Sequence, residues 1–286
     1  MPRTPSLLVV LALLVAGCGR EAAPPPVPEP QPTLRLAVSH DVGLLVERWN
    51  RAMGEEAAGH VHVDVTADSL AYAALLDGAV HAALVHRRAT PAEDRRARGN
   101  DLIDGDGFTY LKLAETPVSL LVHVDNPVQV VTVQQAAGLL GGWLSSWAEV
   151  GGSDAEVRRF VREADTATWQ VVDAWLGEAK PASGQTLPDA RAVATAVAGL
   201  PASLGTGGGL PGRGVRSLGL RLTTGELIMP MSTAGSGAVW PLQRSLVLVT
   251  RGPRRSLVDG WVAKITTPEA RAMAEQNGYV LAGPAP

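Results

Sequence analysis

Short apolar runs and longer helical patterns alternate along most of the chain. The short runs predict β-strands at 34–38, 60–66, 79–87 and 116–124. Segments with apolar residues three and four apart predict helices near 44–53, 70–77, 132–140, 168–177 and 268–277. Strands that alternate with helices are typical of an α/β fold.

Polar residues stand where three of these helices are expected to begin. They are Ser39, His40 and Asp41, then Asp68 and Ser69, and finally Arg162, Asp165, Thr166 and Thr168. A helix N-terminus exposes unpaired backbone N–H groups and the positive end of the helix dipole. Hydroxyls and a guanidinium at such a start predict a receptor for an oxyanion. The alternative is that Asp165 or Thr166 only caps its helix, with Arg162 in solvent.

The segment His60–Thr66 alternates strictly between valines and polar residues. This pattern predicts a half-exposed strand whose valines face a core. His60 and His62 on one strand face are a possible metal pair, but no further ligand cluster stands nearby in the sequence. We therefore expect no metal site.

The first 17 residues have the pattern of an export signal. Arg3 precedes an apolar run at 7–16, which is too short for a bilayer that needs roughly 20 residues. The letters LVAGC resemble the lipobox of bacterial lipoproteins, which implies cleavage before Cys18 and lipidation of its thiol; a signal peptide with a chance cysteine is the alternative. We expect a protein in the periplasm or on the cell surface, anchored to a bacterial membrane through Cys18.

Composition narrows the function classes. Cys18 is the only cysteine among 286 residues, so the mature chain has no internal disulfide and its stability depends on burial of apolar residues, which make up 46% of the sequence. The net charge of −3 excludes electrostatic capture of nucleic acid. Residues 18–33 hold the lipidated cysteine and a Pro-rich stretch that predicts an extended tether, or alternatively a recognition peptide.

Several motifs, in their order along the chain, resemble the phosphate-binding proteins of ABC importers. They are LLDGAVHAALVHR, VDNPV, TVQQAAGLL, WLSSWAEVGGSD, the Arg162–Thr168 segment, VWPLQRSLVLVT and EARAMAEQNGYV. The likeness extends from Leu34 to Leu281. It implies a two-lobed type II periplasmic binding protein, with a mixed sheet and flanking helices in each lobe and the ligand between them. The first lobe would comprise 34–120 and 243–286, and the second 121–242.

The resemblance also implies the ligand-binding residues. The family's first anion loop falls on Ser39, His40 and Asp41, and the second on residues 68–71, of which Ser69 is the expected ligand. The third falls on Arg162, Thr166 and Thr168, and a family arginine is matched by Arg87. The glycines of the third loop become Asp165 and Ala167, and a family acidic residue becomes His81. Asp41, Asp68 and Asp165 are unusual beside an anion. A carboxylate about 4 Å away costs roughly 4 kcal/mol at an effective dielectric near 20, unless it accepts a proton from the ligand or points away.

Three functions remain open. The first is capture of phosphate or a related oxyanion for an ABC importer, with permease subunits as partners. The second is a degenerate binding domain that acts as an envelope sensor or scaffold, and the third is a different ligand, cationic or zwitterionic. We expect a monomer without cofactors and no enzyme, because catalytic motifs are absent and the GGGLPG segment at 207–212 is expected to be a loop.

Overall fold

A computed structural model describes residues 32–54, 60–99, 107–209, 211–231 and 239–282. The expected signal, Cys18 and nearly all of the tether lie outside these residues, so their assignments stay predictions. Residues 32–286 form one compact unit. No helix within the described ranges has the length and apolar character needed to cross a bilayer.

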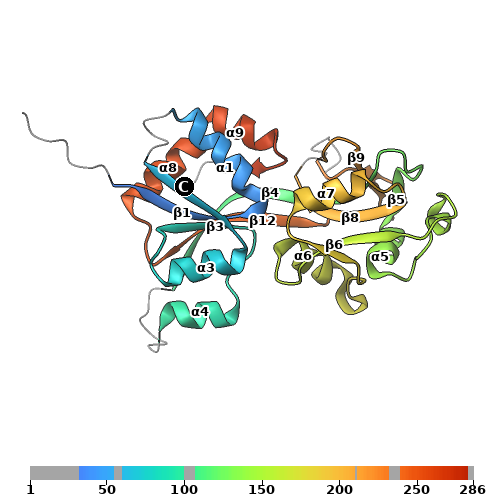
Figure 1. Cartoon of the computed structure of the whole chain (residues 1–286), viewed down its shortest axis with the longest axis horizontal. Coiled ribbons are helices and arrows are strands. Elements are labelled where there is room, and N and C mark those ends of the chain that lie inside the picture. Colours follow the sequence, from blue (N-terminus) through green and yellow to red (C-terminus); the bar gives the residue numbers. More distant parts are fainter. Residues whose placement is uncertain (1–31, 55–59, 100–106, 210, 232–238, 283–286) are drawn as a thin grey trace, which may run out of the picture. The chain divides into compact units, whose positions relative to one another are not determined.

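Strands and helices alternate through most of the described chain, as the hydrophobic pattern predicts (Figure 1). In order they are β1 (Leu34–Ser39), α1 (His40–Ala52), β2 (Val61–Thr66), α3 (Asp68–Leu76), β3 (Ala82–Val85), α4 (Pro91–Arg98), β4 (Phe108–His123), β5 (Val130–Thr132), α5 (Val133–Gly141), the 3₁₀ turn η1 (Trp147–Val150), β6 (Arg158–Arg162), α6 (Ala167–Leu176), the 3₁₀ turn η2 (Gly177–Ala179), β7 (Gln185–Leu187), α7 (Ala190–Ala198), β8 (Ser203–Gly208), β9 (Val215–Ser217), β10 (Gly219–Arg221), β11 (Leu227–Ile228), β12 (Gln243–Arg251), α8 (Ser256–Ile265), α9 (Pro268–Glu275) and β13 (Val280–Leu281).

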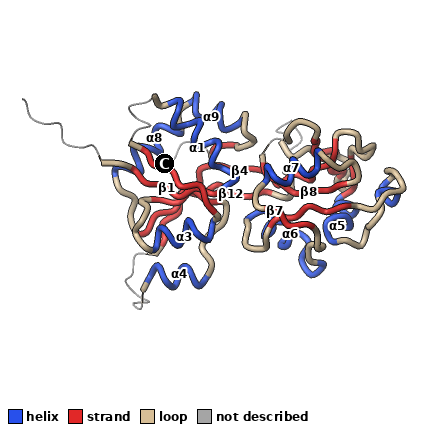
Figure 2. Tube along the Cα trace, in the orientation of Figure 1, coloured by secondary structure: helices blue, strands red, loops and turns tan. Residues whose placement is uncertain are grey.

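The main sheet of the described residues has the order β2-β1-β3-β12-β4-β8-β6-β7, with β13 and β9 also paired to β4. Strands β1, β2 and β3 are parallel, whereas β12 is antiparallel to both β3 and β4. The long strand β4 changes partner midway: its residues up to Pro117 pair with β12, and from Val118 onward they pair with β8. Strands β4 and β12 therefore join two groups of elements (Figure 2).

The first lobe is built on β1, β2, β3, β12 and the first half of β4. Helices α1, α8 and α9 bury Trp49, Trp261 and Ala270 against one face of its sheet. On the other face, Tyr72 and Leu75 of α3 pack on a second cluster of buried residues. A sheet covered by helices on both faces is the α/β arrangement that the sequence predicts.

The second lobe is built on the second half of β4 with β6, β7 and β8. One core joins Val118 and Leu120 of β4 to Trp147, Trp240 and helix α5. A smaller cluster places Val193 and Val197 of α7 on the opposite face of the sheet. The lobe boundaries expected at 120/121 and 242/243 stay predictions.

Two local predictions were wrong. Gly207 and Gly208 end strand β8 instead of starting a loop, because β8 is buried beside β4 and carries the ladder as far as Gly208. In β2, Val65 is 43% exposed rather than facing the core, since β2 lies at the edge of the sheet and only Val61 and Val63 contact the first-lobe core.

The histidine pair at the start of β2 lies away from the cores. His62 contacts Asp64 at 3.2 Å, and both side chains are mostly exposed. Within the described residues, no group of three or more His, Cys, Asp or Glu side chains is placed to hold a metal ion.

Candidate functional site

A cavity of about 220 Å³ lies where helices of the two lobes begin. Its walls come from the starts of α1, α3 and α6, the end of β6, and the turn before α7. The lining residues are Ser39, His40, Asp41, Ala67, Asp68, His86, Arg162, Glu163, Asp165, Thr166, Ala167, Pro188 and Arg244. This volume holds several water molecules or a small ion.

Asp41 of α1 is the centre of the polar cluster beside this cavity. Arg162 of β6 donates from Nη1 to Asp41 Oδ1 at 2.9 Å and to Oδ2 at 3.1 Å. Arg244 of β12 donates from Nη1 to Oδ2 at 2.6 Å. The backbone N–H of Ala190, the first residue of α7, donates to Oδ1 at 3.1 Å. A first-lobe carboxylate thus occupies a helix start of the second lobe, the kind of place where anions bind.

The three charged side chains are buried together, each only 2–4% exposed. Burial alone would raise the pKa of Asp41, but the charges of Arg244 and Arg162 outweigh it and hold the pKa of Asp41 well below its usual range. Asp41 is therefore ionised, and the cluster of one carboxylate and two guanidinium groups carries a net charge of +1.

The approach of Arg244 to this cluster depends on Gly208. A Cβ at Gly208 would lie 1.9 Å from Arg244 Nη2, so only glycine leaves room for the guanidinium over β8. Arg244 also donates from Nη1 to Thr168 Oγ1 at 2.9 Å. Its Nε and Nη2 atoms, and Nε of Arg162, are buried without a hydrogen-bond partner among the described residues.

Asp68, the first residue of α3, is also buried but has fewer hydrogen-bond donors around it than Asp41. Its Oδ2 accepts from the backbone N–H of His86 at 3.4 Å, and its Oδ1 has no partner within the described ranges. Burial raises the pKa of Asp68, and the charge of Arg87 and the backbone N–H of His86 offset only part of this effect. A buried carboxylate oxygen with an unmet bond is an acceptor for a hydroxyl group of a ligand.

His86 links the start of α3 to the start of α1, because its backbone N–H donates to Asp68 and its ring belongs to a chain of hydrogen bonds with Tyr279 and Ser39. Burial and the charge of Arg244 hold the pKa of His86 well below its usual value, so the ring is neutral. Tyr279 donates from its hydroxyl to the Asp41 carbonyl at 3.1 Å, which leaves that oxygen free to accept from His86 Nε2 at 3.2 Å. His86 Nδ1 then accepts from the Ser39 hydroxyl at 3.4 Å. In this arrangement, the single proton of the Ser39 hydroxyl is directed to His86.

A family model described as a PBP superfamily domain matches residues 24–211, well over half of the sequence. The chain belongs to the PBP superfamily. Its mixed α/β fold is that of the two-lobed periplasmic binding proteins, as the sequence predicts. No curated protein sequence matches the chain.

Solved structures share the fold of this chain at low sequence identity. A putative phosphate ABC transporter substrate-binding protein from Clostridium perfringens, with bound phosphate, has a TM-score of 0.72 and 16% identity, over 88% of this chain and 100% of its own. An ABC-type phosphate transport receptor from Vibrio cholerae has a TM-score of 0.63 and 16% identity, over 87% of this chain and 100% of its own. The CcmR regulatory domain from Synechocystis, in complex with 2-PG, has a TM-score of 0.54 and 14% identity, over 83% and 99%.

In this PBP-superfamily chain, most of the predicted ligand-binding residues gather at the cavity. Ser39, His40, Asp41, Arg162 and Thr166 line it. Arg162 is buried rather than in solvent, which contradicts one half of the capping alternative. The other half is correct, because Thr166 caps α6 by accepting from Trp169 N at 3.3 Å.

Three predicted residues do not line the cavity. Ser69 donates to Asp165 at 3.5 Å across the two lobes, and Thr168 lies fully buried behind Arg244. Arg87 forms a two-pronged ion pair with Glu93 at 2.7 and 2.8 Å. The part of each residue in ligand binding stays a prediction.

Sequence reasoning missed Arg244 and Tyr279. Arg244 gives little signal of its own, because it stands between Gln243 and Ser245 at the polar start of its strand, before the apolar run that begins at Leu246. Tyr279 belongs to the C-terminal segment and comes near His86 only through the fold, so no local pattern reveals it.

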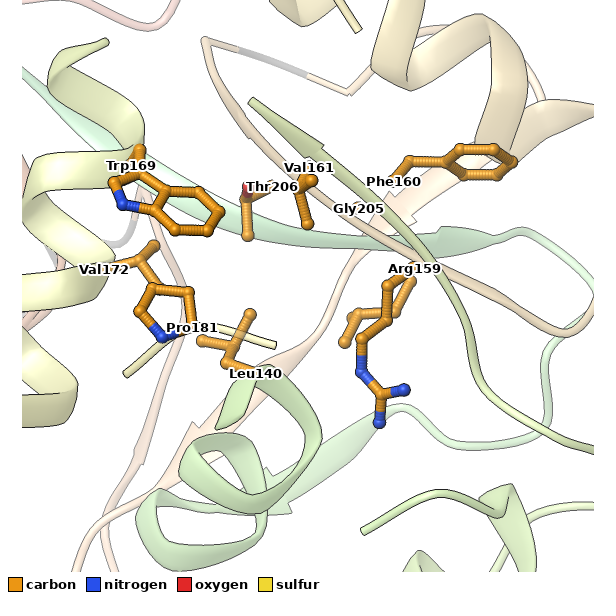
Figure 3. Close-up of a pocket in the computed structure, with 10 residues that line it drawn as sticks. Leu140, Arg159, Phe160, Val161, Trp169, Val172, Pro181, Gly205 and Thr206 are labelled. Atoms are coloured by element: carbon orange, nitrogen blue, oxygen red, sulfur yellow. The ribbon is translucent and has the colours of Figure 1, made fainter. Parts of the chain in front are cut away.

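A separate cavity of about 20 Å³ lies inside the second lobe (Figure 3). Its walls include Leu140, Trp169, Val172 and Pro181, which are apolar. Arg159 also borders it but directs its guanidinium to the carbonyl oxygens of Leu139 and Leu144. This cavity holds no more than about one water molecule and contacts none of the charged cluster.

Proposed function

We propose that this chain is an extracytoplasmic, lipid-anchored substrate-binding protein that captures a protonated oxyanion of the phosphate class for an ABC importer. The fold supports this function, because two-lobed proteins of this kind bind small ligands between their lobes. The proteins from Clostridium perfringens and Vibrio cholerae are named for phosphate transport, and the first contains phosphate. We assign the chain no catalytic role.

One observation carries the proposal: buried donors and a buried acceptor lack partners beside the same cavity. The donors are Arg162 Nε and Arg244 Nε, and the acceptor is Asp68 Oδ1. A buried polar group without a partner costs about 1–3 kcal/mol. A ligand with both anionic oxygens and a hydroxyl, such as hydrogen phosphate, offers partners to both kinds of group. Sulfate has no proton to offer at neutral pH.

The charges agree with a protonated ligand. Asp41, Arg162 and Arg244 together carry +1, and the neighbouring Asp68 reduces this charge whenever it ionises. Glu163 and Asp165 are exposed, so water screens their charges. A monoanion, or a dianion whose hydroxyl binds Asp68, fits this balance better than an unprotonated dianion.

Asp41 sets the condition for entry. Its carboxylate already holds Arg162 and the α7 start, so an incoming anion must share these donors or displace it. The unpartnered guanidinium atoms have no contact with solvent. Binding therefore requires that the Asp41–Arg162 pair loosen and the lobes separate.

The same feature favours a second candidate function, the envelope sensor or scaffold. In that function, the Asp41 carboxylate would permanently occupy the position of the anion, and the cavity would bind no free ligand. The two candidates differ in whether a free anion competes with Asp41.

Calorimetry on the purified chain with phosphate, arsenate and sulfate at pH 7 separates them. The transport function predicts binding of phosphate and arsenate with little affinity for sulfate. Native mass spectrometry beforehand detects any anion retained during purification. No heat with any of the three anions, and no retained ion, would leave the sensor function.

Arg162→Ala tests the site, with Arg158→Ala as a matched control on the same strand. Arg162 is buried on Asp41, whereas the Arg158 side chain is 64% exposed and pairs with Glu156. Loss of a buried charge-assisted contact costs about 2–5 kcal/mol, so Arg162→Ala should weaken phosphate binding by roughly 30-fold or more. Arg158→Ala should change it less than about threefold. Equal affinities in the two variants would contradict the site.

A further inference from the structure

A second and larger pocket, of about 330 Å³, adjoins the first. His86, Ala167 and Arg244 line both, so they form the wall between them. The second pocket continues over the first-lobe strands β4 and β12 and along α6 of the second lobe. Its polar walls include Arg87, Arg88, Lys112, Gln170 and Gln243.

The two pockets differ sharply in charge. Four carboxylates line the first, those of Asp41, Asp68, Glu163 and Asp165, together with Arg162 and Arg244. The second has four basic side chains, those of Arg87, Arg88, Lys112 and Arg244, and no acidic residue among the described ones that line it. Basic groups gathered in one partly enclosed space raise the local concentration of anions.

These basic side chains are not all committed to acidic partners. Arg88 stacks over the ring of Tyr110 at 4.6 Å, and no ion pair between described residues includes it. Arg87 is held by Glu93, yet its Nε is buried without a partner in the described part of the chain. Lys112 contacts Glu115 at 2.5 Å, and about half of its side chain is exposed to solvent.

An inorganic oxyanion bound in the first cavity would leave the basic side chains of the second pocket without a ligand group to contact. We propose that the second pocket binds a second acidic group of the same ligand, so that the ligand is an organic phosphate or phosphonate bearing a carboxylate. This inference rests on the proposed function of the first cavity. Gln170 and Gln243 supply neutral donors between the basic residues, and Arg244 contacts both ends of the ligand.

The probes are phosphonocarboxylates of increasing length, namely phosphonoacetate, 3-phosphonopropionate and 4-phosphonobutyrate. Each is compared by calorimetry with the alkylphosphonate of the same chain length, which lacks the carboxylate. Inorganic phosphate is measured on the same protein. We expect at least one phosphonocarboxylate to bind about tenfold more tightly than its alkylphosphonate, as one added charge-assisted hydrogen bond provides.

Lys112→Gln and Arg88→Gln locate the effect. At least one of the two should remove most of the tenfold advantage of the carboxylate, whereas Lys264→Gln, at an exposed lysine on α8, should preserve it. Circular dichroism verifies that the variants fold. A full advantage in both pocket variants would overturn the assignment.

The outcomes separate this inference from the proposed function. Phosphate binding with no advantage for any carboxylate would overturn the second pocket alone. Binding of a phosphonocarboxylate without phosphate binding would support the second pocket and remove inorganic phosphate as the ligand. No binding of any probe would overturn both.

Discussion

Two buried carboxylates at neighbouring helix starts have opposite surroundings. Asp41 near the start of α1 accepts from two guanidinium groups and a helix N–H. Asp68 at the start of α3 accepts one long bond from a backbone N–H. The pKa of Asp41 is lowered against the effect of its burial by Arg244 and Arg162, whereas burial raises the pKa of Asp68.

The comparison teaches that burial alone does not decide the role of a carboxylate. Both oxygens of the Asp41 carboxylate accept hydrogen bonds, and these bonds tie the two lobes together. The Asp68 site is incomplete, so it can accept a group from outside. One residue is therefore expected to matter most for stability and the other for binding.

Asp41→Ala should have the largest effect on stability. Removing one partner of a buried ion pair leaves the others uncompensated and costs about 3–5 kcal/mol, and here two guanidinium groups lose their counter-charge. Urea denaturation measures the free energy of unfolding. Asp64→Ala, on the exposed face of β2, is the control and should change it by less than about 0.5 kcal/mol. Equal effects of the two substitutions would mean that Asp41 does not hold the cluster.

Gly208→Ala should weaken the contact between Arg244 and Asp41 without removing a charged group. The added methyl group overlaps Arg244 Nη2 and pushes the guanidinium away from Asp41. Overpacking of this kind costs about 1–3 kcal/mol. Gly212→Ala is the control, since nothing described lies within 4 Å of a Cβ there. If thermal denaturation cannot tell the two variants apart, Arg244 does not depend on Gly208.

Asp68→Asn should raise stability at neutral pH by about 1–2 kcal/mol, since it removes the negative charge of a buried carboxylate whose ionised form is penalised by burial. Because the folded-state pKa of Asp68 is raised, its contribution to stability is complete below its ordinary pKa of about 3.9 and declines as the pH rises toward the folded-state value. The gain in the variant should therefore be absent near pH 3.5 and grow toward pH 7.

Asp41 has the opposite dependence on pH. Its folded-state pKa is lowered, so its contribution is complete above about pH 4 and declines as the pH falls through the folded-state value.

Urea denaturation of the wild type and of Asp68→Asn between pH 3.5 and pH 7 tests the prediction for Asp68. A gain in Asp68→Asn that is independent of pH would contradict the raised pKa. Asp68→Asn should also lose affinity for phosphate.

Thr166→Ala should have the smallest effect of the four, a loss of about 0.5–1 kcal/mol. The start of α6 borders the same cavity but is capped by the neutral hydroxyl of Thr166, which donates to Glu163 O at 2.7 Å. Thr166→Ser keeps the hydroxyl and should keep most of the stability in thermal denaturation. If serine is as poor as alanine, the cap contributes through its methyl group instead.

Local patterns predicted most of the fold. The cap at Thr166 is a sequence signal that depends on a residue three positions away. Strand β4 was predicted only in its second half, at 116–124, because its first half, with Lys112 and Glu115, lacks a continuous apolar run. Gly208 was placed in a loop because its role, making room for Arg244, comes from a distant strand.

The candidate site was predicted less completely. Arg162, Thr166 and Asp41 were identified at helix starts, but the ion pairs that hold Asp41 join residues more than 120 positions apart. Sequence reasoning therefore treated Asp41 as an unscreened negative charge. The two guanidinium groups beside it reverse that expectation.

Strand β4 belongs to both cores, since Leu113 and Ala114 pack in the first and Val118, Leu120 and Val122 in the second. Loss of either core frees half of this strand and removes the support on which the other half depends. The two halves of the molecule are thus coupled in folding, and heating should melt them in a single cooperative transition.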